Sequence, residues 1–426
     1  MPKIIKSVKP LNLSKSLIRV ILIILITCGL TIAAIPPVTI HQTAVSAEQE
    51  IRGVWITNVS SGVLFVPWGI NRALDQLSTL NFNTVYPVIW NRGTTFFKSA
   101  VSRRVTGQSQ DSLLHISRLG RDILSEIVIE GHNRGLRVIP WLEYGFMAPI
   151  NSQLVKRHPE WVTTTKDGRL ILPRYTTEAE PVNARLFNQI RRLLLLSPIR
   201  NVWLNPLHPG VQRFLEDLII EVVMKYNIDG IQLDDHFGIP VEFGYDPYTV
   251  SLYKQEHQGK SPPDNPQDPE WRRWRSNKIT DFIEHLVTTI KATKPDCIVS
   301  LSPNPYEFTY NVYLQDWLTW VNRGWIDEVV LQVYRNSLEG FIKELEHHSL
   351  ITTQQKVPLS IGILSGTLHN PVAIKEIAAQ VQEVRDRHLD GVCFFYWETL
   401  WSYLTPDSPK KRRQVFEMMF SEPIVD

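Results

Sequence analysis

The sequence predicts an α/β protein, a (β/α)8 TIM barrel, and three observations lead to this prediction. From Arg52 onward, short apolar runs alternate with amphipathic segments, which is typical of repeated βα units and a parallel sheet. Eight such runs precede the end of the chain, the number that a barrel requires. No glycine-rich phosphate loop follows the first run, so a doubly wound nucleotide-binding sheet is the less favoured alternative.

Each strand is predicted from a short run rich in β-branched and aromatic residues, and each helix from apolar residues with a period near 3.6. The helix 70–80, for example, has apolar residues at positions 70, 74, 77 and 80. The predicted strands are 53–58, 84–90, 137–144, 229–235, 298–302, 328–334, 358–364 and 391–397. The predicted helices are 70–80, 122–134, 211–226, 271–293, 314–323, 338–347, 372–387 and 410–420.

Two stretches are too long or too proline-rich to be plain loops, and we predict them as insertions. The first is 145–208, after strand three, and the second is 261–270, after strand four. The first contains His158–Trp161, which we expect to begin a helix rather than to bind a metal. Insertions after strands lie on the C-terminal face of a barrel, where they would wall a substrate cleft.

Composition restricts the classes of partner. The chain has 426 residues, 43% of them apolar, and a net charge of +2, which gives no electrostatic basis for binding nucleic acid. Thirteen tryptophans and thirteen tyrosines are first of all core material. Aromatic rings also stack on sugars, so this content weakly favours a polysaccharide partner. The oligomeric state is left open by the sequence.

The first 47 residues resemble a targeting segment. Residues 1–19 contain four lysines, one arginine and no acid, and an apolar run follows at 20–35. Small residues at 45–47 provide a cleavage point, which is the pattern of a secretory signal, and an uncleaved membrane anchor is the alternative. We therefore predict an exported protein, whether periplasmic, extracellular or anchored outside the cytoplasm, with one barrel domain at 48–426.

The cysteines and motifs give no indication of a metal or another cofactor. Cys28, Cys297 and Cys393 are far apart, and no Cys-x-x-Cys or Cys/His ligand spacing occurs. Cys297 and Cys393 are expected to be buried thiols rather than a disulfide. No HExxH, GxSxG or P-loop motif is found.

The stretch 229–237 carries the strongest functional signal. It begins as a buried strand and ends in Asp234, Asp235 and His236. Because side chains alternate along a strand, Gln232 and Asp234 are expected to point to the same side. Carboxylates at the C-terminal end of a parallel strand are typical of barrel active sites. The structural alternative is that these aspartates are solvated turn residues or helix caps.

Other predicted strands also end in polar residues, and glycoside hydrolysis explains the set. That reaction needs two carboxyl groups, one to protonate the leaving oxygen and one to attack the sugar or activate water. The catalytic candidates are Asp234, as nucleophile or base, and Glu143, Glu398 and Asp235 as the second carboxyl group. Burial against aromatic neighbours would raise the pKa of the acid. The structural alternative for each glutamate is an ion pair with Arg92 or Arg335.

The remaining polar and aromatic residues near the strand ends are predicted to bind substrate. They are Trp90, Asn91, Trp141, Tyr144, Gln232, His236, Asn304, Gln332, Tyr334 and Trp397. His236 has two further interpretations: it orients Asp234, or it binds a metal together with Asp234 and Asp235. His208 is a remote candidate for another ligand, but no second histidine lies at ligand spacing within the motif.

With these residues identified, the chain resembles glycosyl-hydrolase-like family 10, the DUF187 family, over about residues 50–400. The resemblance implies a TIM barrel that acts on glycans outside the cytoplasm, with bacterial cell-wall glycan strands as a substrate. Its most specific element is Asp229–Asp235. The other matching segments are Arg52–Trp55, Asn81–Tyr86, Trp203–Pro206, Gln332–Tyr334 and Phe394–Trp397.

This chain departs from the family pattern at three strand ends. His236 stands where members commonly have tyrosine, and Asn304 where an aromatic residue often follows Ser-Pro. Glu143 and Tyr144 occupy the place of a frequent Asn-Pro pair, so the resemblance does not extend to Glu143. We expect a glycoside hydrolase; the alternatives are a non-catalytic envelope glycan-binding protein and a metal-dependent carbohydrate deacetylase.

Overall fold

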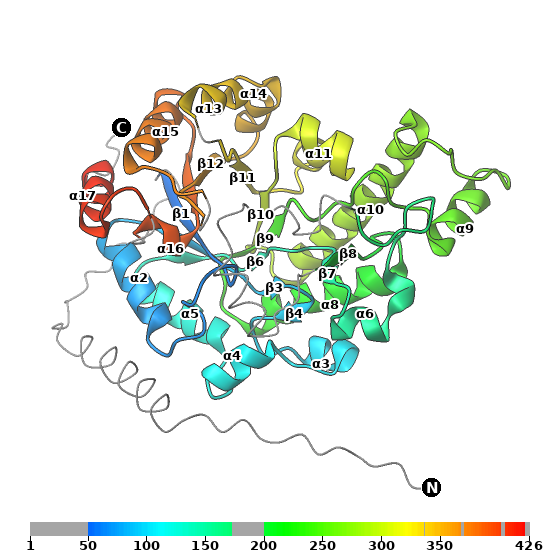
Figure 1. Cartoon of the computed structure of the whole chain (residues 1–426), viewed down its shortest axis with the longest axis horizontal. Coiled ribbons are helices and arrows are strands. Elements are labelled where there is room, and N and C mark those ends of the chain that lie inside the picture. Colours follow the sequence, from blue (N-terminus) through cyan, green and yellow to red (C-terminus); the bar gives the residue numbers. More distant parts are fainter. Residues whose placement is uncertain (1–49, 173–199, 336, 368–369, 402–404, 422–426) are drawn as a thin grey trace, which may run out of the picture. The chain divides into compact units, whose positions relative to one another are not determined.

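A computed structural model describes residues 50–172, 200–335, 337–367, 370–401 and 405–421 (Figure 1). The predicted targeting segment and Cys28 lie outside these residues. In the part of the chain that is described, no helix combines the length and apolar character needed to cross a bilayer. Cys297 and Cys393 are buried and free, as predicted.

One parallel sheet forms the centre of the molecule, and its strands are surrounded by helices (Figure 1). Neighbouring strands are hydrogen-bonded in the order β5-β2-β1-β13-β12-β11-β10-β9-β6. Their bounds are β1 Ile51–Ile56, β2 Thr84–Pro87, β5 Arg137–Val138, β6 Trp141–Leu142, β9 Gly230–Asp234, β10 Ile298–Ser302, β11 Glu328–Gln332, β12 Leu359–Leu364 and β13 Gly391–Phe395. The prediction of a parallel α/β barrel is confirmed by this architecture.

The two strands at the ends of this order, β5 and β6, are parts of the single strand predicted at 137–144. Pro140, which has no N–H to donate, lies in the two-residue interval between them. The backbone N–H of Ile139 donates to Val85 of β2 at 3.0 Å, and the carbonyl of Pro140 accepts from Gln232 of β9 at 2.8 Å. One extended segment is therefore hydrogen-bonded to strands on both of its sides.

Most helices follow the predicted apolar periodicity. They are α2 Gly69–Thr79, α5 Ile123–His132, α8 Pro209–Lys225, α10 Pro269–Thr293, α13 Leu338–Leu345, α15 Ile374–Asp386 and α17 Pro409–Met419. The helix predicted at 314–323 is wrong in its bounds. Leu314 has a positive φ of 59°, which ends α11 (Tyr306–Tyr313) before α12 (Trp317–Asn322) begins. Helices α9 (Pro247–Glu256), α14 (His348–Gln354) and α16 (Trp397–Leu400) were not predicted.

The insertion after the third strand contains an antiparallel pair, β7 (Met147–Pro149) with β8 (Asn201–Trp203), together with α6 (Gln153–Arg157) and a short 3-10 helix at Pro159–Trp161. Buried Asp246 ties this insertion to the segment after β9. Its carboxylate accepts hydrogen bonds from Thr163 at 2.8 Å and Asn205 at 2.9 Å. The insertion after the third strand is therefore joined to the segment between β9 and α9 through one buried acid.

A further insertion, after β2, was not predicted. It starts with a hairpin of β3 (Trp90–Asn91) and β4 (Thr94–Thr95) and continues with α3 (Ala100–Thr106) and α4 (Ser112–Ser117). The two turn residues, Arg92 and Gly93, have φ angles of 52° and 72°. Two positive φ angles in succession characterise the turns that suit tight hairpins.

Candidate active site

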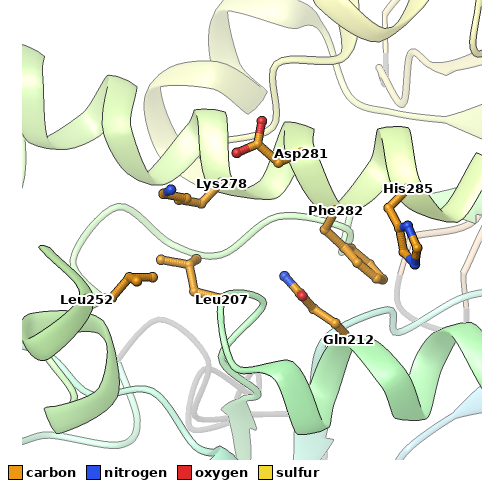
Figure 2. Close-up of a pocket in the computed structure, with 7 residues that line it drawn as sticks. All are labelled: Leu207, Gln212, Leu252, Lys278, Asp281, Phe282 and His285. Atoms are coloured by element: carbon orange, nitrogen blue, oxygen red, sulfur yellow. The ribbon is translucent and has the colours of Figure 1, made fainter. Parts of the chain in front are cut away.

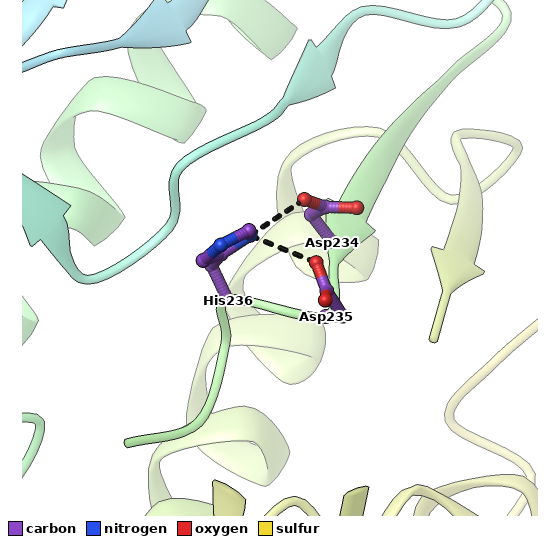
Figure 3. A group of neighbouring side chains, drawn as sticks. All are labelled: Asp234, Asp235 and His236. Atoms are coloured by element: carbon purple, nitrogen blue, oxygen red, sulfur yellow. Dashed lines mark hydrogen bonds and ion pairs between the residues drawn. The ribbon is translucent and has the colours of Figure 1, made fainter. Parts of the chain in front are cut away.

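Strand β9 ends in a compact cluster of Asp234, Asp235 and His236 (Figure 3). Nδ1 of His236 lies 2.9 Å from Oδ2 of Asp234 and 2.8 Å from Oδ1 of Asp235. The other oxygen of each carboxyl group accepts from an amide: Gln332 donates to Asp234 at 2.9 Å and Asn304 donates to Asp235 at 2.5 Å. Asn304 and Gln332, which were predicted to bind substrate, thus form hydrogen bonds with the two aspartates.

The pKa values of the two carboxyl groups in this cluster are shifted in opposite directions. Burial, and then the negative charge of Asp235, raise the pKa of Asp234 well above its ordinary value. Burial is the largest single effect on Asp235 and acts to raise its pKa, but the charge of His236 and the hydrogen bonds from His236, Asp234 and Asn304 together outweigh it and the pKa is lowered. Burial opposes protonation of His236, yet both aspartates together raise its pKa well above the ordinary value. Negative charge is therefore concentrated on Asp235, and Asp234 holds a proton more tightly than a free aspartate.

His236 is fixed between two aromatic rings. Its imidazole stacks on Tyr144 with ring centroids 5.4 Å apart and on Trp203 with centroids 5.7 Å apart. Tyr144 follows β6, and Trp203 is the last residue of β8 in the insertion. Sequence reasoning placed Trp203 only in a family motif and missed this contact, because residues 203 and 236 belong to separate elements.

Glu143 follows a strand that is paired with the strand of Asp234. Leu142, the last residue of β6, pairs with Leu233 of β9; Glu143 is the first residue after β6, and Asp234 is the last residue of β9. The Thr57 hydroxyl donates to Glu143 at 2.8 Å and the Asn91 amide donates at 2.6 Å. Burial raises the pKa of Glu143 to about 7, although both hydrogen bonds and the charges of His236 and Arg92 act in the opposite direction.

Glu398 occupies a separate position, on α16 after β13. The Ser61 hydroxyl and the backbone N–H of Val63 donate to its Oε1, and within the described residues its buried Oε2 has no hydrogen-bond partner. Burial raises its pKa to about 7. Glu143 and Glu398 therefore both qualify electrostatically as acids, and only Glu143 follows a strand that is paired with β9.

The ion-pair alternative for the two glutamates does not fit the structure. Among the described residues, neither Glu143 nor Glu398 forms an ion pair with an arginine. Arg335 instead pairs with Glu344 at 2.7 Å. Arg92 acts on Glu143 through its charge alone.

The predicted substrate-binding residues separate into two groups by exposure. Trp90, Asn91, Trp141, Gln232 and Gln332 are buried, whereas Tyr144, His236, Asn304, Tyr334 and Trp397 are partly exposed. Trp90 donates its indole N–H to Gly145 at 2.9 Å and packs on Phe214, and Gln232 bonds to Trp55 at 2.7 Å. Trp90 and Gln232 are thus buried and bonded to other residues of the chain, and their role in binding substrate stays a prediction.

Tyr334, another member of the partly exposed group, lies within the electrostatic influence of all three acids. Burial raises the pKa of its hydroxyl well above the ordinary value, and the charges of Asp234, Asp235 and Glu143 contribute in the same direction. Its ring packs 5.5 Å from that of Phe395. The charges of the Asp234 cluster and of Glu143 therefore act on the same hydroxyl group, that of Tyr334.

Two other predictions concerned histidines. His208 does not join the cluster: its Nδ1 accepts from Gly210 at 3.0 Å and caps α8. Among the described residues, the group with metal-ligand potential is Asp234, Asp235 and His236, whose ligand atoms lie within 4.8 Å of one another.

A surface pocket lies elsewhere, between α8, α9 and α10 (Figure 2). Its lining residues come from these helices and from Leu207, and none follows a strand of the central sheet. The pocket contains Lys278, Asp281 and His285, but none of the candidate catalytic residues. It is therefore a separate feature of the helical layer.

The fold and the carboxyl groups at its strand ends define a class, the barrel-fold glycoside hydrolases, in which paired carboxyl groups cleave glycosidic bonds. Comparison with known proteins identifies the family. The family model described as glycosyl hydrolase-like 10 matches residues 50–184 and 174–383. The chain belongs to this family, as its motifs predicted, and is a glycoside hydrolase.

Relatives and solved structures agree with this assignment. Glycosyl hydrolase DigH of Escherichia coli strain K12 is 26% identical over 335 residues, which cover 70% of this chain and 68% of DigH. Glycosyl hydrolase YngK of Bacillus subtilis strain 168 is 23% identical over 75% of this chain and 60% of its own length. The PgaB (BpsB) glycoside hydrolase domain from Bordetella bronchiseptica superimposes with a TM-score of 0.57 at 15% identity, covering 86% of this chain and 98% of that domain, which shows a shared fold.

Proposed function

We propose that this protein is an exported glycoside hydrolase that cleaves O-glycosidic bonds in bacterial cell-wall glycan strands, with Asp234 and Glu143 as its reacting carboxyl groups. The observation that supports the proposal is the pairing of Leu142 with Leu233, because Glu143 and Asp234 directly follow these two residues at the same end of adjacent strands. The family membership supports a carbohydrate substrate. The basic and apolar N-terminal residues support export.

In this proposal Glu143 is the general acid. An acid must hold a proton at the working pH and release it to the leaving oxygen, and a pKa of about 7 suits that task. The Thr57 hydroxyl and the Asn91 amide donate to the carboxylate, so they stabilise the ion that forms once the proton has been transferred. These two donors also fix the orientation of the carboxyl group.

Asp234 is the base or nucleophile in the same proposal. Asp234 must be ionised to act in either role, and once it is ionised its raised pKa gives it a greater affinity for the proton that a base accepts from water. Asp235 and His236 are positioning residues, because the imidazole holds both carboxyl groups and is itself fixed between two rings. Partly exposed Tyr144, Tyr334 and Trp397 would bind the sugar.

A metal-dependent hydrolase, such as a carbohydrate deacetylase, is the second candidate function. Asp234, Asp235 and His236 offer three ligand atoms within 4.8 Å of one another, which is the observation that favours it. In the present arrangement Nδ1 of His236 is engaged by both carboxyl groups, so this nitrogen would have to change partners to bind a cation.

The test is release of reducing ends from purified peptidoglycan glycan strands by the protein and by its Asp234→Asn variant, both in the presence of a chelator. We expect release by the parent and a loss of at least about 10³-fold in the variant, because a reacting carboxylate is removed. Full activity of the variant would refute the role of Asp234. Loss of activity in the parent on chelation would favour the metal-dependent function. Equal glycan affinity of both proteins without any hydrolysis would favour a binding protein.

A further inference from the structure

The pocket between α8, α9 and α10 has the size of a ligand site and contains none of the candidate catalytic residues (Figure 2). Residues three and four positions apart lie on the same side of a helix, and one face of α10 lines the pocket with Lys278, Asp281, Phe282 and His285. The volume of the pocket is about 160 Å³. A cavity of about 150 Å³ holds one benzene ring, so this pocket suits one six-membered ring of a ligand.

The lining of the pocket combines apolar surface with polar groups of both kinds. Leu207, Leu252 and Phe282 provide the apolar surface. The Gln212 amide can donate and accept hydrogen bonds, and the Asp281 carboxylate accepts them. A few polar groups set in an apolar lining fix the orientation of a small ligand. The ring of a sugar matches this lining, because it has carbon–hydrogen faces and hydroxyl groups that donate and accept.

The ionisable residues of the lining favour a neutral ligand. Lys278 and Asp281 carry opposite formal charges, which cancel. Lys278 pairs with Glu256 at 2.7 Å, and His285 pairs with Glu216 at 3.0 Å. Among the described residues, Asp281 has neither a hydrogen bond nor an ion pair. Its carboxylate is therefore the acceptor that remains for a hydroxyl group, and a hydrogen bond to an ionised acceptor is among the stronger ones.

One packed residue separates the wall of the pocket from the catalytic cluster. The ring of Phe282 lies 6.0 Å from that of Phe146, and the backbone N–H of Phe146 donates to the carbonyl oxygen of His236 at 3.1 Å. Both phenylalanines are buried, whereas Asp281 is exposed. A substitution of Asp281 therefore changes the pocket without removing a contact of the catalytic cluster.

We propose that this pocket binds one neutral sugar ring of a glycan, and that the protein thereby holds its polymeric substrate at a second site. In this arrangement Asp281 accepts a hydrogen bond from a hydroxyl group, Gln212 bonds to a second hydroxyl group, and the ring packs on Phe282. The inference rests on the proposed function for the choice of glycan and adds a binding site that takes no part in the cleavage.

The test measures binding apart from cleavage. Insoluble peptide-free peptidoglycan glycan is sedimented with the Asp234→Asn variant, in which we expect no turnover, and with the same variant carrying a second substitution. Asp281→Ala should raise the Kd for the glycan about 10-fold or more, because a hydrogen bond to a charged group is lost. Asp281→Asn should raise it less, since the amide oxygen still accepts a hydrogen bond.

Glu284→Gln is the matched control, because it removes an exposed carboxylate from the same helix outside the pocket. It should not weaken binding. The glycan itself carries carboxylates, so the loss of a negative charge from the protein would by itself strengthen binding. Weaker binding by Asp281→Ala therefore reports a lost contact, and thermal unfolding of each variant confirms that the fold is kept.

Each outcome decides between the pocket and the proposed function. If Asp281→Ala leaves the Kd unchanged, or if the Asp234→Asn variant does not bind the glycan, the pocket is not a site for this glycan. Cleavage of the glycan by the parent then still supports the proposed function. If the parent does not cleave the glycan but Asp281→Ala weakens binding, the proposed function fails and the second site stands.

Discussion

Two of the buried glutamates have different surroundings, Glu328 at the first position of β11 and Glu143 just after β6. They are similarly inaccessible, with 3% and 6% of their surfaces exposed. Glu328 has both a hydrogen bond and an ion pair: the Tyr86 hydroxyl donates to it at 2.9 Å, and Arg137 pairs with it at 3.2 Å. Glu143 receives two neutral hydrogen bonds and no ion pair within the described residues, and burial raises its pKa to about 7.

The two glutamates lie at opposite ends of their strands: Glu328 begins β11, and Glu143 follows the last residue of β6. A buried carboxylate that is paired contributes to a stable structure, whereas one that is left without a cation gains a proton affinity near neutral pH. In barrels of this class the N-terminal end of the strands serves stability and the C-terminal end serves catalysis. Two residues of the same type can therefore be assigned different roles from their partners alone.

The largest expected effect is on activity. Glu143→Gln should lower kcat/KM by about 10²–10⁴-fold, because general acid catalysis contributes that range. Glu328→Gln should retain activity within a few-fold of the parent under conditions where it is folded. Initial rates on cell-wall glycan strands, measured for both variants, check this contrast. Similar losses in the two variants would show that the two ends of the barrel do not differ as described.

The effects of the two substitutions on stability should be in the reverse order, with the larger loss in Glu328→Gln. Glu328→Gln leaves the Arg137 charge without its partner, and Arg137 is only about one-quarter exposed, so the free energy of unfolding should fall by about 2–4 kcal/mol. Glu143→Gln keeps the size of the side chain and removes a carboxyl group that burial disfavours, so it should not destabilise the fold. Urea unfolding of both variants measures these values; a Glu143 variant that is the less stable of the two would contradict the account.

A smaller effect on activity is expected for His236. His236→Asn removes the imidazole that holds Asp234 and Asp235 and should lower kcat by about 10–100-fold with little change in KM, since positioning rather than chemistry is lost. His257 stacks on Tyr253 at 3.7 Å in a similar manner but lies at the end of α9, away from the strand ends. His257→Asn is therefore the control and should leave kcat unchanged. A rise in KM alone for His236→Asn would indicate a substrate contact.

The smallest effect concerns the pH dependence of stability. Glu143 binds its proton up to about pH 7 in the folded state, against an ordinary value of 4.5, so the folded state binds more protons between these values. The contribution of Glu143 to the free energy of unfolding is thus present below about pH 4.5 and is lost as the pH rises to about 7. Glu143→Gln should reduce this pH dependence. Adding Glu398→Gln should reduce it further, because burial also raises the pKa of Glu398 to about 7. Unfolding measured from pH 4 to pH 8 tests the sign.

Periodicity in the sequence was sufficient to predict the parallel barrel and the strand that ends in Asp234. It failed where local geometry intervenes: Pro140 divides the third strand, and Leu314, predicted to begin a helix, has a positive φ and ends the unpredicted α11 instead. The partners of the site residues were not predictable, because Trp203, Asn91 and Thr57 reach His236 or Glu143 from other elements. Exposure also could not be read from residue type, as buried Trp90 shows.

The most direct test of the proposed acid is the dependence of rate on the leaving group. Parent and Glu143→Gln are assayed on a series of aryl glycosides, made from the sugar that the parent cleaves, whose phenols range from weakly to strongly acidic. A phenol that departs without protonation no longer needs the acid. We therefore expect the deficit of Glu143→Gln to be large for weakly acidic phenols and to approach zero for strongly acidic ones. A deficit of the same size across the series would contradict the assignment of Glu143 as the acid.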